Sequence, residues 1–508
     1  MLWSFASIAF IDAPLLQSLA AQAKSRLPEF SAQDLSKTAW SLASVPCPDV
    51  PLIEAIAAPA VPIIGEFKPQ NLSNTAWSFA ALKICNQPFM DAISAEAISK
   101  ITAFLPQDLA CTSWAFARCR IMDSPLLEAI AAASIMLISE FSMRSLANMA
   151  WSMAKLMFSD VPLLAAIASP ALFILHEFNP QGLSNTSWAF AVLLFQDRRC
   201  FDDIAMPSHL QAGEFQPQNL SNMVWAFATL LLEDKPLFNV LAEEAFRKID
   251  HGDAQFIANT VWAFAKVLFE DFDVFSFAAR SADRFLDFDA RALANIAWSV
   301  AKVQVSDPPL MQVLSAAALA RIRTGDAQAL GNIAWAFAVV GCLDPTLMDA
   351  LSKESLAKIH DFNPQNLANI AWSFARLSIS NEELMQAIAT EAVPRMIECI
   401  SQNLTNIAWS CATCCFRNTP LLAAIAERAI KIIGDSSPQD LSNTAWSFAT
   451  LLYLHAPFLE ALAGAALSTL LDWDTQNLAN TSWALALLDF LHQPLFHAIA
   501  APAMQNIE

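Results

Sequence analysis

Fourteen tryptophans recur along this chain at a nearly constant interval. They stand at Trp3, Trp40, Trp77, Trp114, Trp151, Trp188, Trp225, Trp262, Trp298, Trp335, Trp372, Trp409, Trp446 and Trp483. Twelve of the thirteen intervals are 37 residues long, and the interval from Trp262 to Trp298 is 36. A fixed period in this range is typical of stacked units that are each too small to bury their own apolar face. The sequence predicts an all-α solenoid of tandem helical hairpins, with thirteen complete repeats of about 37 residues.

The repeats extend from one end of the chain to the other, so residues 1–508 are expected to form a single continuous array. The first Trp lies two residues after Met1, in the middle of an expected helix, and we expect an array truncated at both ends. The longest uncharged apolar stretch, Val161 to Leu175, contains two prolines and is shorter than the ~18 to 20 residues of a membrane span. No membrane association is expected.

The ten cysteines show no paired framework, and several replace apolar residues of the repeat. Cys119 and Cys414 lie five residues after a Trp, where Leu or Val is usual, and Cys411 takes the place of a Phe. Reduced thiols in the core are therefore favoured over a metal site, since the cluster of Cys411, Cys414 and Cys415 lacks a second group of ligands. This pattern predicts an intracellular, reducing compartment and no bound metal.

Counted from each Trp as position 0, the segment from −10 to +5 predicts a helix with its own start signal. Position −9 is Ser, Asp or Asn in nine of thirteen repeats, and position −8 is Pro in six. These residue types are favoured at the N-cap and the first helical position. An aromatic residue at −10 is expected to pack on the Leu at −5 as a hydrophobic staple.

A second helix is expected to begin after the Asp or Asn that twelve of fourteen repeats carry at +9. His455 and His492 take this position in the remaining two repeats. Proline at +19, as in Pro59 and Pro207, is expected to kink or split the helix. Residues 196–214 and 270–290 are predicted to be the least regular second helices.

The Trp-containing helix is predicted to present two faces. Leu at −5, Ala at −1, Phe at +2 and Leu or Val at +5 share a broad face that should form the core. Position +3 is Ala in all thirteen complete repeats, which allows neighbouring helices to approach closely and forms a slot for each Trp. The Trp is interpreted as a packing residue rather than a base-stacking one. The remaining arc consists of Gln at −7, Asn at −3 and a variable residue at +4.

Position +4 is basic in five of thirteen repeats and acidic in none, although the chain has 48 acids and 29 bases. The five residues are Arg118, Lys155, Lys266, Lys302 and Arg376. A column whose charge opposes that of the whole chain is a candidate for phosphate contacts. The alternative is a solvated last helical turn, where cations complement the helix dipole.

Asparagine occupies position −3 in eleven repeats. These residues are Asn74, Asn148, Asn185, Asn222, Asn259, Asn295, Asn332, Asn369, Asn406, Asn443 and Asn480. An amide offers a donor and an acceptor together and is suited to the edge of a nucleobase. We favour instead a buried ladder of amides that bridges adjacent helices, because position −3 hardly varies and a reading code needs variety. The varied residues at −6 lie in the first helical turn, where short polar residues are favoured for local reasons.

No enzyme signature is present, because the seven His are scattered and the sequence has no glycine-rich phosphate loop, HExxH or GxSxG. Catalytic residues and cofactors are therefore not expected.

The repeat motif Gln-x-Leu-Ser/Ala-Asn-Thr/Ile-Ala/Ser-Trp-Ser/Ala-Phe-Ala is best seen at Gln70–Ala80, Gln365–Ala375 and Gln439–Ala449. It resembles the helical repeats of the octotricopeptide and heptatricopeptide families and the leucine-rich region of FAST-kinase-like, RAP-associated organellar proteins. The resemblance implies that single-stranded organellar RNA, and not DNA, binds the arc at −7, −3 and +4. It also implies support of transcript processing, stability or translation in the mitochondrial matrix or chloroplast stroma. The chain shows neither a transit peptide nor a RAP module, as expected of a fragment.

A second function is compatible with the same fold. The net charge of −19 suits a protein-binding α-solenoid scaffold without a nucleic-acid ligand, as in armadillo-like or HEAT-like solenoids. We therefore expect either an RNA-binding solenoid or a scaffold that binds a protein partner.

Overall fold

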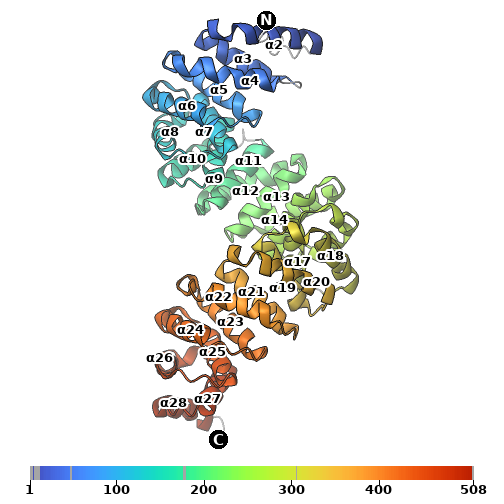
Figure 1. The fold of residues 1–508 in the computed structure, drawn as a ribbon, viewed down its shortest axis with the longest axis vertical. Helices are drawn as coiled ribbons and strands as arrows, with labels where there is room; N and C mark the ends of the chain where they lie inside the picture. The colour runs from blue at the N-terminus through green and yellow to red at the C-terminus, as the bar shows by residue number, and fades with distance from the viewer. Residues whose placement is uncertain (1–3, 5–11, 46–48, 175–178, 305, 506–508) are drawn as a thin grey trace. The chain divides into compact units, whose positions relative to one another are not determined.

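The computed structural model describes residues 4, 12–45, 49–174, 179–304 and 306–505. Within these ranges every regular element is a helix (Figure 1). The chain divides into two compact units, Met1–His251 and Gly252–Glu508. Each unit is a helical-repeat solenoid, which confirms the predicted all-α class. That the two belong to one continuous array stays a prediction.

Each repeat contributes a helix that contains the Trp, here called the Trp helix. In the first unit these are α3 (Ala32–Ser44), α5 (Pro69–Ala81), α7 (Pro106–Cys119), α9 (Met143–Lys155), α11 (Pro180–Val192) and α13 (Pro217–Thr229). In the second unit they are α15 (Ala254–Lys266), α17 (Ala290–Lys302), α19 (Ala327–Val340), α21 (Pro364–Arg376), α23 (Ser401–Thr413), α25 (Pro438–Thr450) and α27 (Thr475–Leu487). Consecutive Trp helices of a unit pack directly against one another.

The helix that follows each Trp helix is here called the second helix. In the first unit these are α2 (Ala13–Arg26), α4 (Val50–Ala60), α6 (Gln87–Ser99), α8 (Ser124–Met136), α10 (Val161–Ile174), α12 (Arg198–Gln211) and α14 (Lys235–Lys248). In the second unit they are α16 (Val274–Arg280), α18 (Pro308–Arg321), α20 (Pro345–Ala357), α22 (Glu382–Ala392), α24 (Thr419–Lys431), α26 (Ala456–Ser468) and α28 (Gln493–Gln505). Many second helices continue into a short 3₁₀ turn, such as η3 (Ile101–Ala103) after α6.

The predicted start signals of the Trp helices are confirmed. Where position −9 is Ser, Asp or Asn, its side chain accepts a hydrogen bond from the backbone N–H at −6, as Asn179 does from Gly182 at 2.8 Å. Lys68, Leu105, Gln216 and Ile400 stand at −9 in the other four repeats, and there the bond is reversed. Residue −6 is then Asn or Asp and accepts from the backbone N–H at −9. The residue at −6 thus varies because it takes part in capping the start of its own helix, as the sequence predicts.

The second helices begin largely as predicted. His455 and His492 replace the usual Asp as N-cap, each accepting through Nδ1 from a backbone N–H at 3.2 Å. In the repeat that is one residue short, the cap is Asp273 instead of Asp271, and α16 has only seven residues. The prediction of irregularity is thus right for 270–290. It is wrong for 196–214, because α12 spans 14 residues with Pro207 inside the helix.

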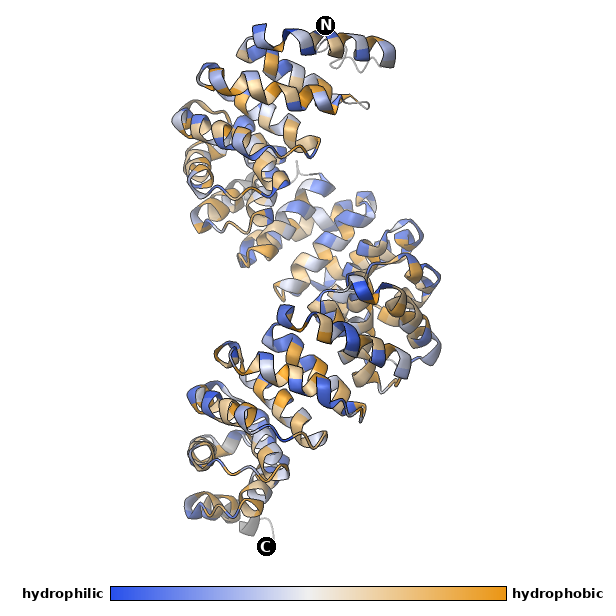
Figure 2. Cartoon of the chain, in the orientation of Figure 1, coloured by the Kyte–Doolittle hydropathy of each residue, from blue (hydrophilic) through white to orange (hydrophobic). Residues whose placement is uncertain are grey.

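The core lies on the predicted face of the Trp helices. In α5, for example, Leu72, Ala76 and Phe79 at −5, −1 and +2 are fully buried. The alanine at +3 forms the seam between neighbouring repeats, where Ala301 packs with Ala336 of the next Trp helix. Figure 2 shows apolar and polar residues interspersed along each helix, as expected for amphipathic helices that bury one face. No helix within the described ranges is long and apolar enough to cross a bilayer.

A column of basic residues at the C-terminal ends of second helices links consecutive repeats, and it could not be recognised in the sequence. Nζ of Lys358, at +23, donates hydrogen bonds to the carbonyl oxygens of Arg323 (2.7 Å) and Gly325 (2.8 Å) in the preceding repeat. Lys100 and Lys248 make the same pair of bonds in their own repeats. We call this arrangement the carbonyl clamp. Each of the three lysines also pairs with a Glu one turn earlier, which holds the ammonium group in place.

The Trp helices end at a residue of unexpected type. Position +6 has a positive φ in Lys83, Arg120, Met157, Leu194, Leu231, Leu268, Gln304, Gly341, Ser378, Cys415, Leu452 and Asp489. This left-handed conformation closes a helix and ordinarily favours glycine, which only Gly341 supplies. Several of these side chains are large, apolar and more than half exposed, among them Leu231 and Leu452 at 63% each.

Candidate nucleic-acid interface

The Trp, the Asn and the variable cation lie on one face of each Trp helix. At ~100° per residue, positions −7, −3, 0 and +4 fall within a narrow arc, here called the Trp-helix stripe. In α21, Gln365 and Arg376 are exposed, whereas Asn369 and Trp372 are partly buried. The prediction that separated the Trp column from the polar arc is therefore wrong, because the indoles lie on the stripe itself.

The indole rings of neighbouring repeats pack on one another. Ring centroids lie 6.2 to 6.5 Å apart, with interplanar angles of 26° to 35°, in Trp77–Trp114, Trp114–Trp151, Trp262–Trp298, Trp298–Trp335, Trp372–Trp409 and Trp446–Trp483. Contact between aromatic rings at such distances stabilises the stack of repeats. The indoles thus have the predicted packing role and also an accessible edge, since the repeat Trp side chains that the structure describes are at least partly exposed.

All eleven predicted asparagines are partly exposed on the stripe. Their backbone carbonyls accept hydrogen bonds from the Ser at +1 where one is present, as Asn295 does from Ser299 at 2.6 Å. In the part of the chain that the structure describes, no hydrogen bond joins their side-chain amides to another protein group. The amides are therefore available to a ligand.

The polar bonds between Trp helices lie at other positions. Ser73 donates to Asp108 at 2.7 Å and Ser442 donates to Asn477 at 2.9 Å, each linking position −4 to position −6 of the next repeat. These bonds are buried and hold neighbouring repeats in register. The favoured interpretation, in which the −3 asparagines form this ladder, is therefore wrong.

The five predicted cations are exposed at +4, on the C-terminal turns of their helices. Arg118 and Lys155 lie on the adjacent helices α7 and α9 of the first unit. In the second unit Lys266 and Lys302 lie on the adjacent helices α15 and α17, and Arg376 lies on α21. None of the five forms an ion pair or a hydrogen bond among the described residues, and Lys266 Nζ lies 6.0 Å from the centroid of the Trp262 ring. They thus differ from the lysines of the carbonyl clamp, whose ammonium groups are occupied.

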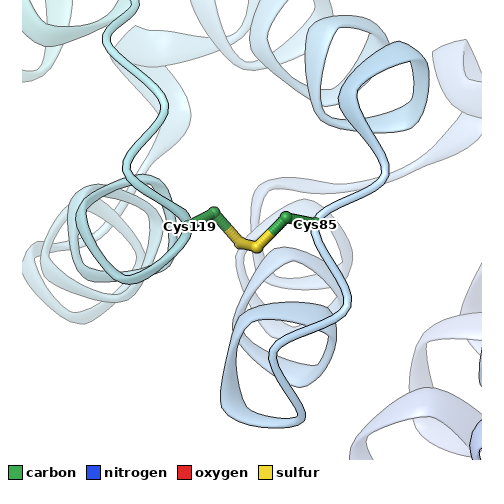
Figure 3. Close-up of a disulfide and its surroundings, with 2 residues drawn as sticks. All are labelled: Cys85 and Cys119. Atoms are coloured by element: carbon green, nitrogen blue, oxygen red, sulfur yellow. A yellow bond between two sulfur atoms is a disulfide. The ribbon is translucent and has the colours of Figure 1, made fainter.

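The cysteines depart from the prediction at one pair. Cys85 and Cys119 form a disulfide between neighbouring repeats, with their Cα atoms 5.5 Å apart (Figure 3). The prediction of reduced thiols is wrong for this pair, because the fold brings +8 of one repeat next to +5 of the following one. The cysteine pattern therefore no longer supports the prediction of a reducing compartment.

The Cys411 cluster has the character of core thiols. Burial raises the pKa of Cys411 to about 12, so this thiol stays protonated near neutral pH. Burial also raises the pKa of Cys414, whereas Cys415 is exposed. Within the described ranges, no group of three or more His, Cys, Asp or Glu side chains is arranged to hold a metal ion.

Comparisons with known proteins identify one family. The profile of the RNA-editing substrate-binding complex 6 protein family matches residues 1–124, 104–358 and 309–493. No curated protein matches the chain. Among solved structures, a chain of a homology model of the full-length AP-3 complex in an intermediate open conformation is similar at 11% identity and a TM-score of 0.32, over 96% of this chain and 83% of that one. A superposition this loose bears on neither the site nor its ligand.

Proposed function

Because the chain belongs to the RNA-editing substrate-binding complex 6 protein family, we propose that it binds single-stranded RNA along the Trp-helix stripe. In this proposal it acts in an organelle, the mitochondrion, and supports the processing, stability or translation of transcripts. The stripe has the groups that such a ligand requires. Exposed cations suit phosphates, and free amides suit base edges.

The observation that supports RNA most strongly is the contrast between two sets of cations. Lys100, Lys248 and Lys358 are bound to backbone carbonyls and to glutamates, so their charge is used within the fold. Arg118, Lys155, Lys266, Lys302 and Arg376 have no such partners and share the stripe with the unbonded amides. Unpaired cations in a chain of net charge −19 favour a local anionic ligand.

A salt series with labelled single-stranded RNA tests this proposal. We expect neutralisation of all five cations to Gln to weaken binding for every sequence. Each phosphate contact on a single strand contributes about −0.7 to the slope of log K against log salt concentration, so the negative slope of the five-cation variant should be shallower by about 3.5. A matched control neutralises five exposed cations outside the stripe, namely Lys235, Arg323, Lys353, Arg417 and Lys431.

The control variant has the same net charge as the stripe variant, so a general loss of attraction would affect both equally. Equal weakening in the two variants would contradict a path along the stripe. Wild-type protein that retains no RNA even at low salt, where screening is least, would exclude RNA as the ligand.

A second candidate function, the protein-binding scaffold, is favoured by one observation. Large apolar side chains such as Leu194, Leu231 and Leu452 stand at +6, where both their exposure and the positive φ are unfavourable. A hollow of about 530 Å³ between the 268–275 segment and the end of α17 adds apolar surface from Phe269 and Val303. A protein partner would bury these groups. Binding through the +6 side chains should be insensitive to the five stripe cations, whereas Lys302 also lines the hollow.

A further inference from the structure

A hollow of about 320 Å³ lies on the stripe between the N-terminal halves of α9 and α11. Its polar lining consists of Arg144, Asn148, Asn179, Gln181 and Asn185. This volume is within the range of small-molecule sites, about 300–1,000 Å³. None of the lining residues that the structure describes is acidic.

Two positions that bridge some of the other repeats hold small residues at this hollow. Position −6 of α11 is Gly182, and position −4 of α9 is Ala147. In the pair α5 and α7 the same two positions hold Ser73 and Asp108, whose side chains bond across the gap at 2.7 Å. No side chain from −6 can therefore bond to −4 between α9 and α11.

Among the described residues, the cation of this hollow lacks the partner that its counterpart in another repeat has. Arginine replaces Gln at −7 in only two repeats, at Arg144 and Arg291. Arg291 donates from Nη2 to Asp326, the N-cap of the next Trp helix, at 2.9 Å. The corresponding N-cap beside Arg144 is the neutral Asn179. Arg144 has no ion pair or hydrogen bond in the part of the chain that the structure describes.

We infer that this hollow binds a single ribonucleotide of the RNA strand. The guanidinium group of Arg144 would receive the phosphate, because its planar fork of donors matches phosphate oxygens. The amides of Asn148, Gln181 and Asn185 would bond the base edge, since each offers a donor and an acceptor. The inference rests on the proposed function. It makes the pair α9 and α11 the place along the stripe where one nucleotide of the RNA is selected.

The test uses the full chain and the free 5′-monophosphates of adenosine, guanosine, cytidine and uridine, with binding measured by calorimetry. Asn179→Asp keeps a good N-cap but places a carboxylate beside Arg144, as Asp326 does beside Arg291. Arg144→Gln restores the residue most frequent at −7. We expect both variants to weaken binding of the preferred nucleotide by about tenfold or more, which is the effect of losing one charge-assisted hydrogen bond. Their melting temperatures should match that of the wild type.

Arg291→Gln is the matched control, since it removes the same side chain from the same repeat position where the cation is already paired. It should leave nucleotide affinity unchanged. Inorganic phosphate alone should compete weakly, because it lacks the base. Unchanged affinity in both Asn179→Asp and Arg144→Gln, or binding of phosphate as tight as that of every nucleotide, would overturn the inference.

The five-cation variant separates this inference from the proposed function. If the five-cation variant no longer binds RNA while Arg144→Gln binds all four monophosphates as tightly as the wild type, the stripe binds RNA but the hollow is not a nucleotide site. If nucleotides bind in an Arg144-dependent manner and RNA is not retained, the hollow is a nucleotide site and the RNA path is wrong.

Discussion

The ammonium group of Lys358 donates a hydrogen bond to the carbonyl oxygen of Gly325, which lies 33 residues earlier in the sequence, at 2.8 Å. The same ammonium group bonds the carbonyl of Arg323 and pairs with Glu354 at 3.3 Å. A single side chain thus satisfies two carbonyls near the 3₁₀ turn of the preceding repeat. The bond is partly buried, so its loss leaves acceptors with reduced access to water.

Lys358→Met should therefore lower the free energy of unfolding by about 1–3 kcal/mol, since charged hydrogen bonds are lost and acceptors are left unpaired. Lys353→Met is the control in α20, the helix that Lys358 follows, because the Lys353 side chain is 72% exposed and pairs with Asp349 alone among the described residues. The control should change stability by less than about 0.5 kcal/mol. Chemical denaturation of both variants checks the difference, and equal losses would contradict a structural role for the clamp.

The alanine seam predicts a second stability effect. Ala301 is 1% exposed and packs with Ala297 and Ala336. Ala301→Leu should cost about 1–3 kcal/mol by overpacking this contact, whereas Lys302→Ala on the exposed stripe should change little. Equal melting temperatures of the two variants would refute the assignment of these neighbouring residues to opposite faces.

The left-handed residue at +6 predicts opposite effects for two substitutions. A Cβ added at Gly341 meets no atom within 4 Å, so Gly341→Ala tests backbone strain alone and should cost about 1 kcal/mol. Leu452→Gly removes the same strain at an exposed site and should stabilise the chain by about 0.5–1 kcal/mol. Thermal denaturation of both variants provides the measurement. A destabilised Leu452→Gly protein would show that the leucine packs on something that outweighs its backbone cost.

The disulfide predicts a redox-dependent stability. Cys85 and Cys119 close a loop with a sequence separation of 34, so reduction should lower the free energy of unfolding by about 2–4 kcal/mol. A reductant should shift the melting temperature of the wild type but not that of Cys85→Ser. Thiol titration of the unfolded protein gives an independent count. The same number of free thiols with and without reductant would show that the pair is not joined.

The sequence predicted those features that depend on neighbours within one helix. The N-caps at −9 and +9, the core residues at −5, −1 and +2, and the exposure of the +4 cations follow from local chemistry and helical period. The clamp at Lys358 could not be predicted, because its acceptors are backbone carbonyls that only the stacking of repeats brings within reach. The disulfide crosses repeats in the same way. The left-handed ends were missed because residues such as Leu231 give no glycine signal.

The hydrogen bonds between repeats all connect neighbouring units, and this affects how the number of repeats can change. Each reaches about one repeat along the sequence, as the 33-residue span of the clamp and the 35-residue span from Ser73 to Asp108 show. Stability in such an array is a sum of nearest-neighbour terms. Deletion or duplication of one whole 37-residue unit would bring equivalent repeat surfaces into contact, so that nearly every bond between adjacent repeats could form again. The size of the array is thus open to change by unequal recombination between its own repeats, without a new fold having to arise.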